Sequence, residues 1–207
     1  MKFSDIFEKF IKKSPVSVIG YSLVERVLAP DQLNDWFSSI SEKQYTRKLL
    51  FSSVLDLMSS VVNGVSSSVN AAFQIMECDL GVTRSALYNK INSIEIGTSA
   101  ALVKKIASEL EKIIIEISGE RPSLLPGYRV KMLDGNCIEA THHRISELRD
   151  VGAGALPGKT LVVFDPSLGI AIDVFPCEDG HAQERSLLPE VIKTVEESDL
   201  WIADRNF

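Results

Sequence analysis

The first 120 residues place their hydrophobic side chains at helical spacing. In residues 99–119 five apolar residues fall at every third or fourth position, which is the period of one face of a helix. Thr98 or Ser99 can cap the start of this helix, and Gly119 followed by Pro122 ends it. The apolar residues of this face are Val103, Ile106, Leu110, Ile113 and Ile117. We expect the face to pack against a core or, as the alternative, to form a dimer seam.

A second segment, residues 43–62, has the same helical spacing and begins with basic side chains on a separate surface. Its apolar positions are Leu50, Val54, Leu57 and Val61, and its basic ones are Lys43, Arg47 and Lys48. Together the two segments predict an all-helical region over residues 1–120.

After residue 127 the pattern changes to short apolar or alternating runs, which are typical of strands. Residues 121–127 contain Pro and Gly and predict a linker. Residues 160–165 and 170–175 are joined by Pro-Ser-Leu-Gly, which predicts a β-hairpin. Residues 186–199 return to helical spacing. The predicted strands are 128–133, 160–165, 170–175 and 200–204. We therefore expect an α+β chain whose residues 128–207 form an α/β sheet domain.

The composition is ordinary for a globular protein. The chain has 207 residues, of which 45% are hydrophobic and 24% are charged. No apolar run reaches the roughly 18 residues of a membrane span, and the N-terminus lacks the features of a signal peptide, so we expect a cytoplasmic protein. The cysteines are far apart and form no Cys-x-x-Cys pair, which argues against a disulfide framework or a zinc site. They are Cys78, Cys137 and Cys177.

The formal net charge of −6 does not point to a nucleic-acid partner, but the charge is unevenly distributed. Residues 1–120 hold 13 basic and 14 acidic side chains, whereas residues 178–207 hold 3 basic and 8 acidic ones. The excess acid therefore lies near the end of the chain, and a basic surface earlier in the chain is compatible with the composition.

Residues 67–92 have the pattern of a helix-turn-helix. An apolar helix leads to a turn at Gly81, and Thr83 can cap a second helix that runs from Arg84 to about Ile91. The second helix carries side-chain types that suit phosphate and base-edge contacts. The residues that we expect to contact DNA, with the basic start of 43–62 included, are Arg47, Lys48, Thr83, Arg84, Ser85, Tyr88, Asn89 and Lys90. The alternative is an ordinary helical hairpin.

Two carboxylates, Asp134 and Asp204, each end a predicted strand. They would meet at one edge of the sheet if their strands were neighbours, and paired carboxylates there could bind Mg²⁺, a hard cation that prefers oxygen ligands. For Asp134 alone the competing interpretation is a turn, because Asp-Gly is a common turn pair. His142 and His143 are adjacent, so their side chains diverge, and a zinc site is not expected.

Three stretches resemble the DDE transposases of bacterial insertion sequences, in the IS-four-like branch. The first, QYTRKLLFSSVLDLM (44–58), resembles the N-terminal helical segment of that branch. The second, VKMLDGN (130–136), looks like the first catalytic strand. The third, residues 156–192 followed by LWIADRNF, is similar to the family's hairpin, helix and second catalytic strand. In this order the stretches cover nearly the whole chain.

The resemblance implies an RNase H-like catalytic domain, a mixed sheet with helices, which holds two Mg²⁺ ions on an Asp-Asp-Glu set. Asp134 would be the first member and Asp204, 70 residues later, the second. The Glu of the family's Tyr-Arg-Glu-Lys signature lies downstream of position 207, and no glutamate of this chain, Glu184 included, is in the expected order. The resemblance therefore implies an incomplete, truncated domain with weak or absent Mg²⁺ binding, little activity of its own, and exposed apolar surface around Trp201 and Phe207.

The implied function is transposition, in which water and then a DNA 3′-OH attack phosphodiesters. The partners would be double-stranded DNA, namely terminal inverted repeats and target DNA, and a second copy in a homodimer when the protein is complete. In a bacterial cytoplasm the protein would be nucleoid-associated when bound to DNA. The alternatives are a non-catalytic DNA-binding protein, a helix-turn-helix regulator and, less favoured, a two-carboxylate phosphatase or hydrolase unrelated to DNA.

Overall fold

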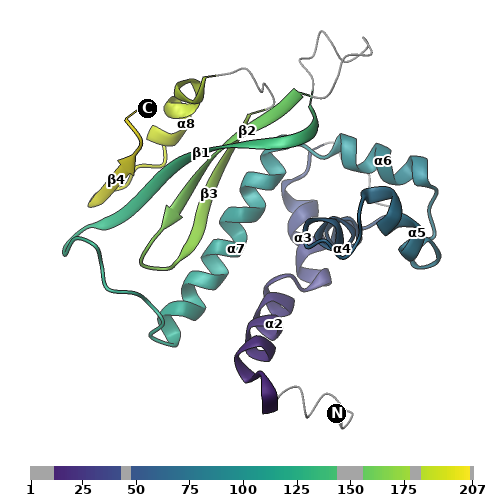
Figure 1. Cartoon of the computed structure of the whole chain (residues 1–207), viewed down its shortest axis with the longest axis horizontal. Helices are drawn as coiled ribbons and strands as arrows, with labels where there is room; N and C mark the ends of the chain where they lie inside the picture. The colour runs from purple at the N-terminus through teal and green to yellow at the C-terminus, as the bar shows by residue number, and fades with distance from the viewer. Residues whose placement is uncertain (1–11, 43–47, 144–155, 178–182, 206–207) are drawn as a thin grey trace. The chain divides into compact units, whose positions relative to one another are not determined.

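The computed structural model describes residues 12–42, 48–143, 156–177 and 183–205, and side chains at 21, 136–143 and 156–158 are outside the description. The fold is α+β: helices precede a four-stranded mixed sheet (Figure 1). The chain divides into two compact units, Met1–Ile94 and Glu95–Phe207. Within the described residues, no helix is both long enough and apolar enough to cross a membrane.

The first unit is helical. Its elements are α2 (Pro15–Val27), α3 (Pro30–Ile40), α4 (Phe51–Val62), α5 (Val69–Leu80) and α6 (Arg84–Ser93). Both α2 and α3 begin with a proline, which is tolerated there because the first N–H groups of a helix have no intrahelical acceptor. Leu57 and Leu87 are completely buried at the centre of the core, to which α4, α5 and α6 contribute. The rings of Phe37 and Phe51 stack with centroids 4.2 Å apart.

Local capping fixes the turn between α5 and α6. Gly81 ends α5 with φ of 57°, a left-handed conformation that glycine adopts without strain. The Thr83 hydroxyl then accepts a hydrogen bond from the Ala86 N–H at 3.3 Å and caps α6. The sequence predicts this turn, this cap and a helix starting at Arg84, and all three are present.

The second unit joins a long helix to the sheet. Its elements are α7 (Ile96–Glu116), β1 (Arg129–His143), β2 (Leu156–Asp165), β3 (Ile170–Cys177), the 3-10 helix η2 (Glu184–Leu187), α8 (Leu188–Ile192) and β4 (Asp199–Ala203). The strand order is β3-β2-β1-β4, with β1 antiparallel to β2 and parallel to β4. The predicted hairpin is β2–β3, while the helix predicted over 186–199 ends earlier, because the chain turns after Ile192 to enter β4.

The structure groups α7 with the sheet, whereas the sequence placed this helix in the N-terminal region. The predicted linker 121–127 therefore lies inside the second unit. It is tied to the β2–β3 turn by the Arg121 N–H, which donates to the Ser167 carbonyl at 2.9 Å, and by the Ser167 hydroxyl, which donates to the Arg121 carbonyl at 3.2 Å. The sheet core is built from Leu133, Leu161, Val163 and Val191.

The apolar face predicted for α7 is not its most buried face. Val103, Ile106, Leu110 and Ile113 are half-buried and Ile117 is exposed, while the buried side chains of α7 are Thr98 and Ala107. Trp201, around which exposed apolar surface was expected, is half-buried against the sheet core, and Phe207 is outside the described residues.

Candidate functional site

Asp134 and Asp204 are brought together by the register of two parallel strands. The pairing of β1 with β4 runs from Arg129 opposite Asp199 to Leu133 opposite Ala203. One residue further along each strand are Asp134 and Asp204. Partners in register share a face of the sheet, and neighbouring strands are about 4.8 Å apart. The register therefore brings the two aspartates near each other, Asp134 within β1 and Asp204 just after β4, and both are exposed. The prediction that Asp134 ends its strand is wrong, because β1 continues to His143 and pairs with β2 beyond Asp134.

Each aspartate accepts a hydrogen bond from the backbone N–H that follows it. Gly135 donates to Asp134 Oδ1 at 2.9 Å, and Arg205 donates to Asp204 Oδ1 at 2.7 Å. Two adjacent carboxylates suit Mg²⁺, which is commonly bound through one or two carboxylates, several waters and substrate phosphates. No group of three or more His, Cys, Asp or Glu side chains in the described part of the chain gathers for a metal.

A third carboxylate approaches this edge from η2. The carboxylate of Glu184 occupies the space in which a side chain at position 135 would begin: Oε2 is 2.9 Å from the place of a Cβ, and Oε1 is closer. The resemblance to DDE transposases excludes Glu184 from the metal site, because Glu184 precedes Asp204 in the chain. No local pattern indicates that η2 packs beside β1.

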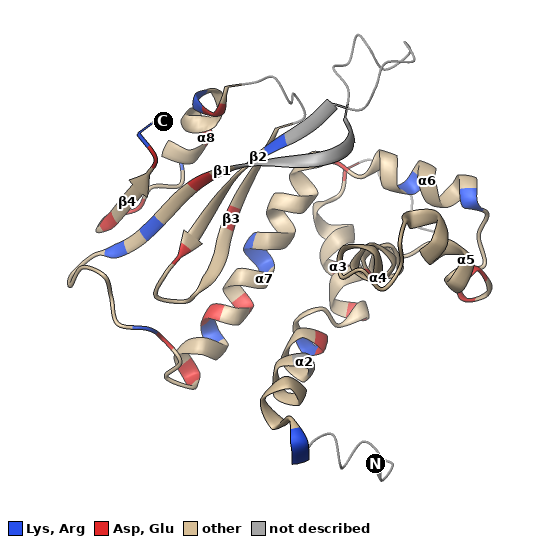
Figure 2. Cartoon of the chain, in the orientation of Figure 1, with Lys and Arg blue, Asp and Glu red and all other residues tan. Residues whose placement is uncertain are grey.

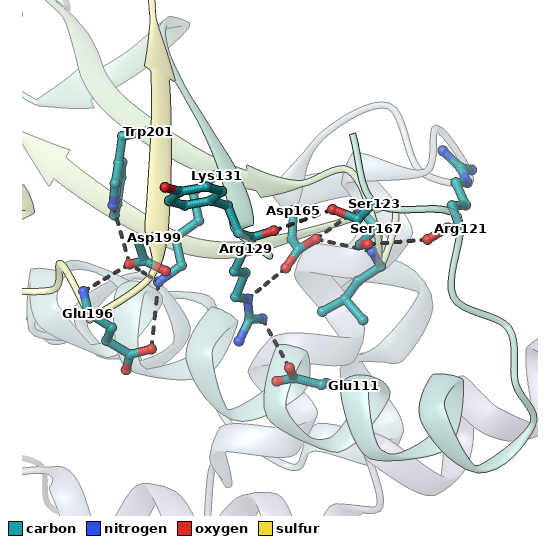
Figure 3. Close-up of polar contacts among 12 residues, drawn as sticks. Glu111, Arg121, Ser123, Arg129, Lys131, Asp165, Ser167, Glu196, Asp199 and Trp201 are labelled. Carbon is teal, nitrogen blue, oxygen red and sulfur yellow. Dashed lines mark hydrogen bonds and ion pairs between the residues drawn. The ribbon is translucent and has the colours of Figure 1, made fainter. Parts of the chain in front are cut away.

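The opposite ends of β1 and β4 hold buried ion pairs (Figure 3). Lys131 Nζ is 2.7 Å from Asp199 Oδ2, and Asp199 also accepts from the Trp201 indole and the Glu196 N–H. Burial raises the pKa of Asp199, but the hydrogen bond and charge of Lys131, with the other two donors, outweigh burial and lower it. The Lys131 ammonium also lies 5.5 Å from the centroid of the Trp201 ring.

A second pair on the same face centres on Arg129 (Figure 3). Its Nε is 2.9 Å from Asp165 Oδ2, and its Nη2 is 3.0 Å from Glu111 on α7. Burial lowers the pKa of Arg129, but the Asp165 hydrogen bond and the nearby carboxylates outweigh it and raise the pKa. Asp165 also accepts from the N–H groups of Ser167 and Leu168, which closes the hairpin turn.

A cavity of about 380 Å³ lies on this face, between α7 and the sheet. Lys104 and Glu111 of α7 line it together with Arg129, Lys131 and Asp173 of the sheet. Lys104 pairs with Asp173 at 3.0 Å. Because the basic groups of the cavity are all paired with carboxylates, the cavity does not present a free positive charge to an anion.

The expected DNA-contact residues are divided by burial. Lys48, Thr83, Arg84, Ser85, Tyr88 and Asn89 are exposed. Arg84 Nη1 lies 3.4 Å from the side-chain oxygen of Asn70 on α5. Arg47 lies outside the described residues. The basic residues of α6 are Arg84 and Lys90 (Figure 2), and Arg84 is the exposed one.

The expectation that Lys90 is exposed for DNA contact is wrong. Lys90 is only 8% exposed, and its ammonium lies 5.1 Å from the centroid of the Phe37 ring. Among the described residues its Nζ has no hydrogen-bond partner, and burial lowers its pKa. The helical period predicted a surface position from residues 84–91 alone, but α3 supplies Phe37 from far away in the sequence, and it covers this side chain.

Two cysteines lie among the described side chains. Cys78 is exposed and Cys177 is half-buried. The side chains of Cys137, His142 and His143 are outside the description.

Comparisons of the chain with protein-family models, with curated proteins and with solved structures gave no match.

Proposed function

We propose that this chain belongs to the DNA transposition machinery, with Asp134 and Asp204 as the metal-binding carboxylates of an RNase H-like catalytic domain. The observation that carries the proposal is the parallel register of β1 and β4, whose last pair, Leu133 and Ala203, directly precedes these two exposed aspartates. The observed order of hairpin, helix and second carboxylate-bearing strand is also the order that the resemblance to DDE transposases implies.

Mg²⁺ held by this pair would supply charge stabilisation for the attack on a phosphodiester. The chain's own contribution is to bring two exposed carboxylates together beside the end of β4, where a DNA backbone can approach. The next N–H along the chain, of Gly135 or Arg205, binds one oxygen of each carboxylate and restricts its rotation.

DNA recognition is assigned to α6 in the first unit, with Arg84 as its exposed cation and Ser85, Tyr88 and Asn89 as polar contacts. These residues can reach phosphates and base edges, whereas Lys90 is left out because it is buried. The proposed partners are double-stranded DNA, in the form of terminal inverted repeats and target DNA, and a second copy of the protein.

The test is divalent-metal binding by the purified full chain. We expect Mn²⁺, a paramagnetic substitute for Mg²⁺, to bind the wild type, and Asp134→Asn or Asp204→Asn to weaken binding at least tenfold. Asp56→Asn, which removes an exposed carboxylate from α4, is the matched control and should bind as the wild type does. If Asp134→Asn and Asp204→Asn bind Mn²⁺ like the wild type, the metal assignment is wrong.

A second candidate function is DNA binding without catalysis. It requires only the exposed residues of α6, namely Arg84, Ser85, Tyr88 and Asn89. Duplex DNA binding and plasmid nicking, measured side by side with and without Mg²⁺, separate the two. Binding that ignores Mg²⁺ and gives no nicking supports the second candidate.

A further inference from the structure

A Cβ at Gly135 would meet the carboxylate of Glu184. The backbone does not demand glycine here, since the glycines with positive φ are at 64, 81, 127 and 169 and Gly135 is not among them. The carboxylate of Glu184 therefore lies directly against β1 at Gly135, and a larger residue at this position would displace the end of this flexible side chain.

Glu184 is held in place by the sheet core. Leu187 and Leu188, at the junction of η2 and α8, pack against the cluster that includes Leu133 and Leu161. Val191, one turn later, is buried in the same cluster. The backbone that carries Glu184 is therefore anchored to β1 and β2 by buried apolar contacts, which fix where its carboxylate lies.

Glu184 contacts β1 on the face opposite Asp134. Successive residues of a strand point to opposite faces, so Gly135 shares a face with Leu133 while Asp134 points to the other one. The register agrees, because Gly135 pairs with the completely buried Leu161. The Gly135 N–H is also the hydrogen-bond donor to Asp134 Oδ1. A residue that fixes Gly135 thus acts on Asp134 through the backbone.

We propose that Glu184 is a positioning residue of the carboxylate pair. It packs against Gly135 on the face of β1 opposite Asp134 and thereby keeps Asp134 beside Asp204. The proposal rests on the proposed function, because the pair is the metal site assigned there. Its importance follows from the sensitivity of reacting groups to placement, since a shift of about 1 Å can cost roughly 100-fold in rate.

The first test compares Mn²⁺ affinity in the full chain under conditions where every variant is folded. We expect Glu184→Ala to weaken Mn²⁺ binding about three- to tenfold, and Glu184→Gln, which keeps the shape, to restore it to within about twofold of the wild type. Glu190→Ala, an exposed glutamate of α8, is the control and should have no effect. A role in folding alone would change the unfolding midpoint without this rescue pattern.

Two results overturn the proposal. If Glu184→Gln weakens Mn²⁺ binding as much as Asp134→Asn does, Glu184 is a metal ligand and not a positioning residue. If Glu184→Ala binds Mn²⁺ like the wild type, Glu184 does not position the carboxylate pair.

If the wild type binds no Mn²⁺, the proposed metal site is wrong. A second measurement still tests whether Glu184 positions Asp134 in that case. Amide hydrogen exchange at Gly135 reports its hydrogen bond to Asp134 without any metal. We expect faster exchange at Gly135 in Glu184→Ala than in the wild type, and no change in Glu190→Ala. Unchanged exchange at Gly135 in Glu184→Ala would show that Glu184 does not position this part of β1.

Discussion

The two ends of the β1–β4 pair carry charged side chains in opposite physical situations. At the start of the strands, Lys131 and Asp199 are buried and bonded to each other at 2.7 Å. Where their pairing ends, Asp134 of β1 and Asp204 just after β4 follow the last register pair, and both are exposed and of like charge. One pair of neighbouring strands therefore holds both an opposite-charge pair inside the protein and a like-charge pair at its surface.

Burial explains the first arrangement, and the proposed metal site would explain the second. A buried charge is costly without a partner, so Asp199 is surrounded by three donors. Like charges on neighbouring strands repel and add nothing to stability. Two exposed carboxylates of like charge are the arrangement that the proposed metal site requires. Aspartates on the same two strands thus differ in burial, and with burial differs the partner that each one needs.

The largest expected effect is at the buried end. Asp199→Asn leaves the Lys131 ammonium buried without its closest carboxylate, and should lower the free energy of unfolding by about 3 kcal/mol. Urea unfolding followed by Trp201 fluorescence, in a Trp36→Phe background so that only the second unit reports, measures this. A loss under about 1 kcal/mol would mean that Glu196, 3.9 Å from Lys131, replaces Asp199.

The pH dependence of the same pair is the second test. The pKa of Asp199 is lowered from its ordinary value of 3.8, so its stabilisation is complete above that pH and is lost as the pH falls through the lower folded-state value. Urea unfolding between pH 5 and pH 2.5 should therefore show the gap between wild type and Asp199→Asn closing toward low pH. A constant gap would contradict the lowered pKa.

Lys90 is, in contrast to Lys131, a buried cation that has no carboxylate partner among the described residues. Lys90→Met keeps the packing against Phe37 and removes the buried charge, so we expect about 1 kcal/mol of added stability. Because burial lowers the pKa of Lys90, the advantage should shrink at alkaline pH, where the amine of the folded wild type loses its proton.

The control for Lys90→Met is Arg84→Met, at an exposed position of the same helix. It should change stability by less than about 0.5 kcal/mol but weaken duplex DNA binding, measured by fluorescence anisotropy, whereas Lys90→Met should leave DNA affinity unchanged. Weaker DNA binding by Lys90→Met with unchanged stability would contradict the burial of this side chain.

The smallest expected effect on stability is at the exposed Asp134 and Asp204. Asp134→Asn and Asp204→Asn should each change the free energy of unfolding by less than about 0.5 kcal/mol, and the sign should favour the variant because a like-charge repulsion is removed. The measurement is urea unfolding without metal at neutral pH. A loss of unfolding free energy comparable to that of Asp199→Asn would show that the aspartate pair stabilises the fold, as the buried pair does.

Features set by neighbours along the chain could be predicted from the sequence. The turn at Gly81, the Thr83 cap, the β2–β3 hairpin and the strands that lead to Asp134 and Asp204 depend on residues within a few positions of one another. The helix predicted over 186–199 was too long, since its periodicity continued past the residue at which the chain turns into β4.

The sequence alone predicted a helical region followed by strands, the β2–β3 hairpin and the residues of the candidate chemistry, but it made the strand at 128–133 too short and the helix at 186–199 too long. Only the tertiary structure decided the register that sets Asp134 beside Asp204, the burial of Lys90 under Phe37, the packing of α7 with the sheet, and the approach of Glu184 to Gly135. The physical reason is the range of the interactions. Caps and turns arise within about four residues, whereas the approach of Asp204 to Asp134, of Phe37 to Lys90 and of Glu184 to Gly135 joins residues that are 49 or more positions apart.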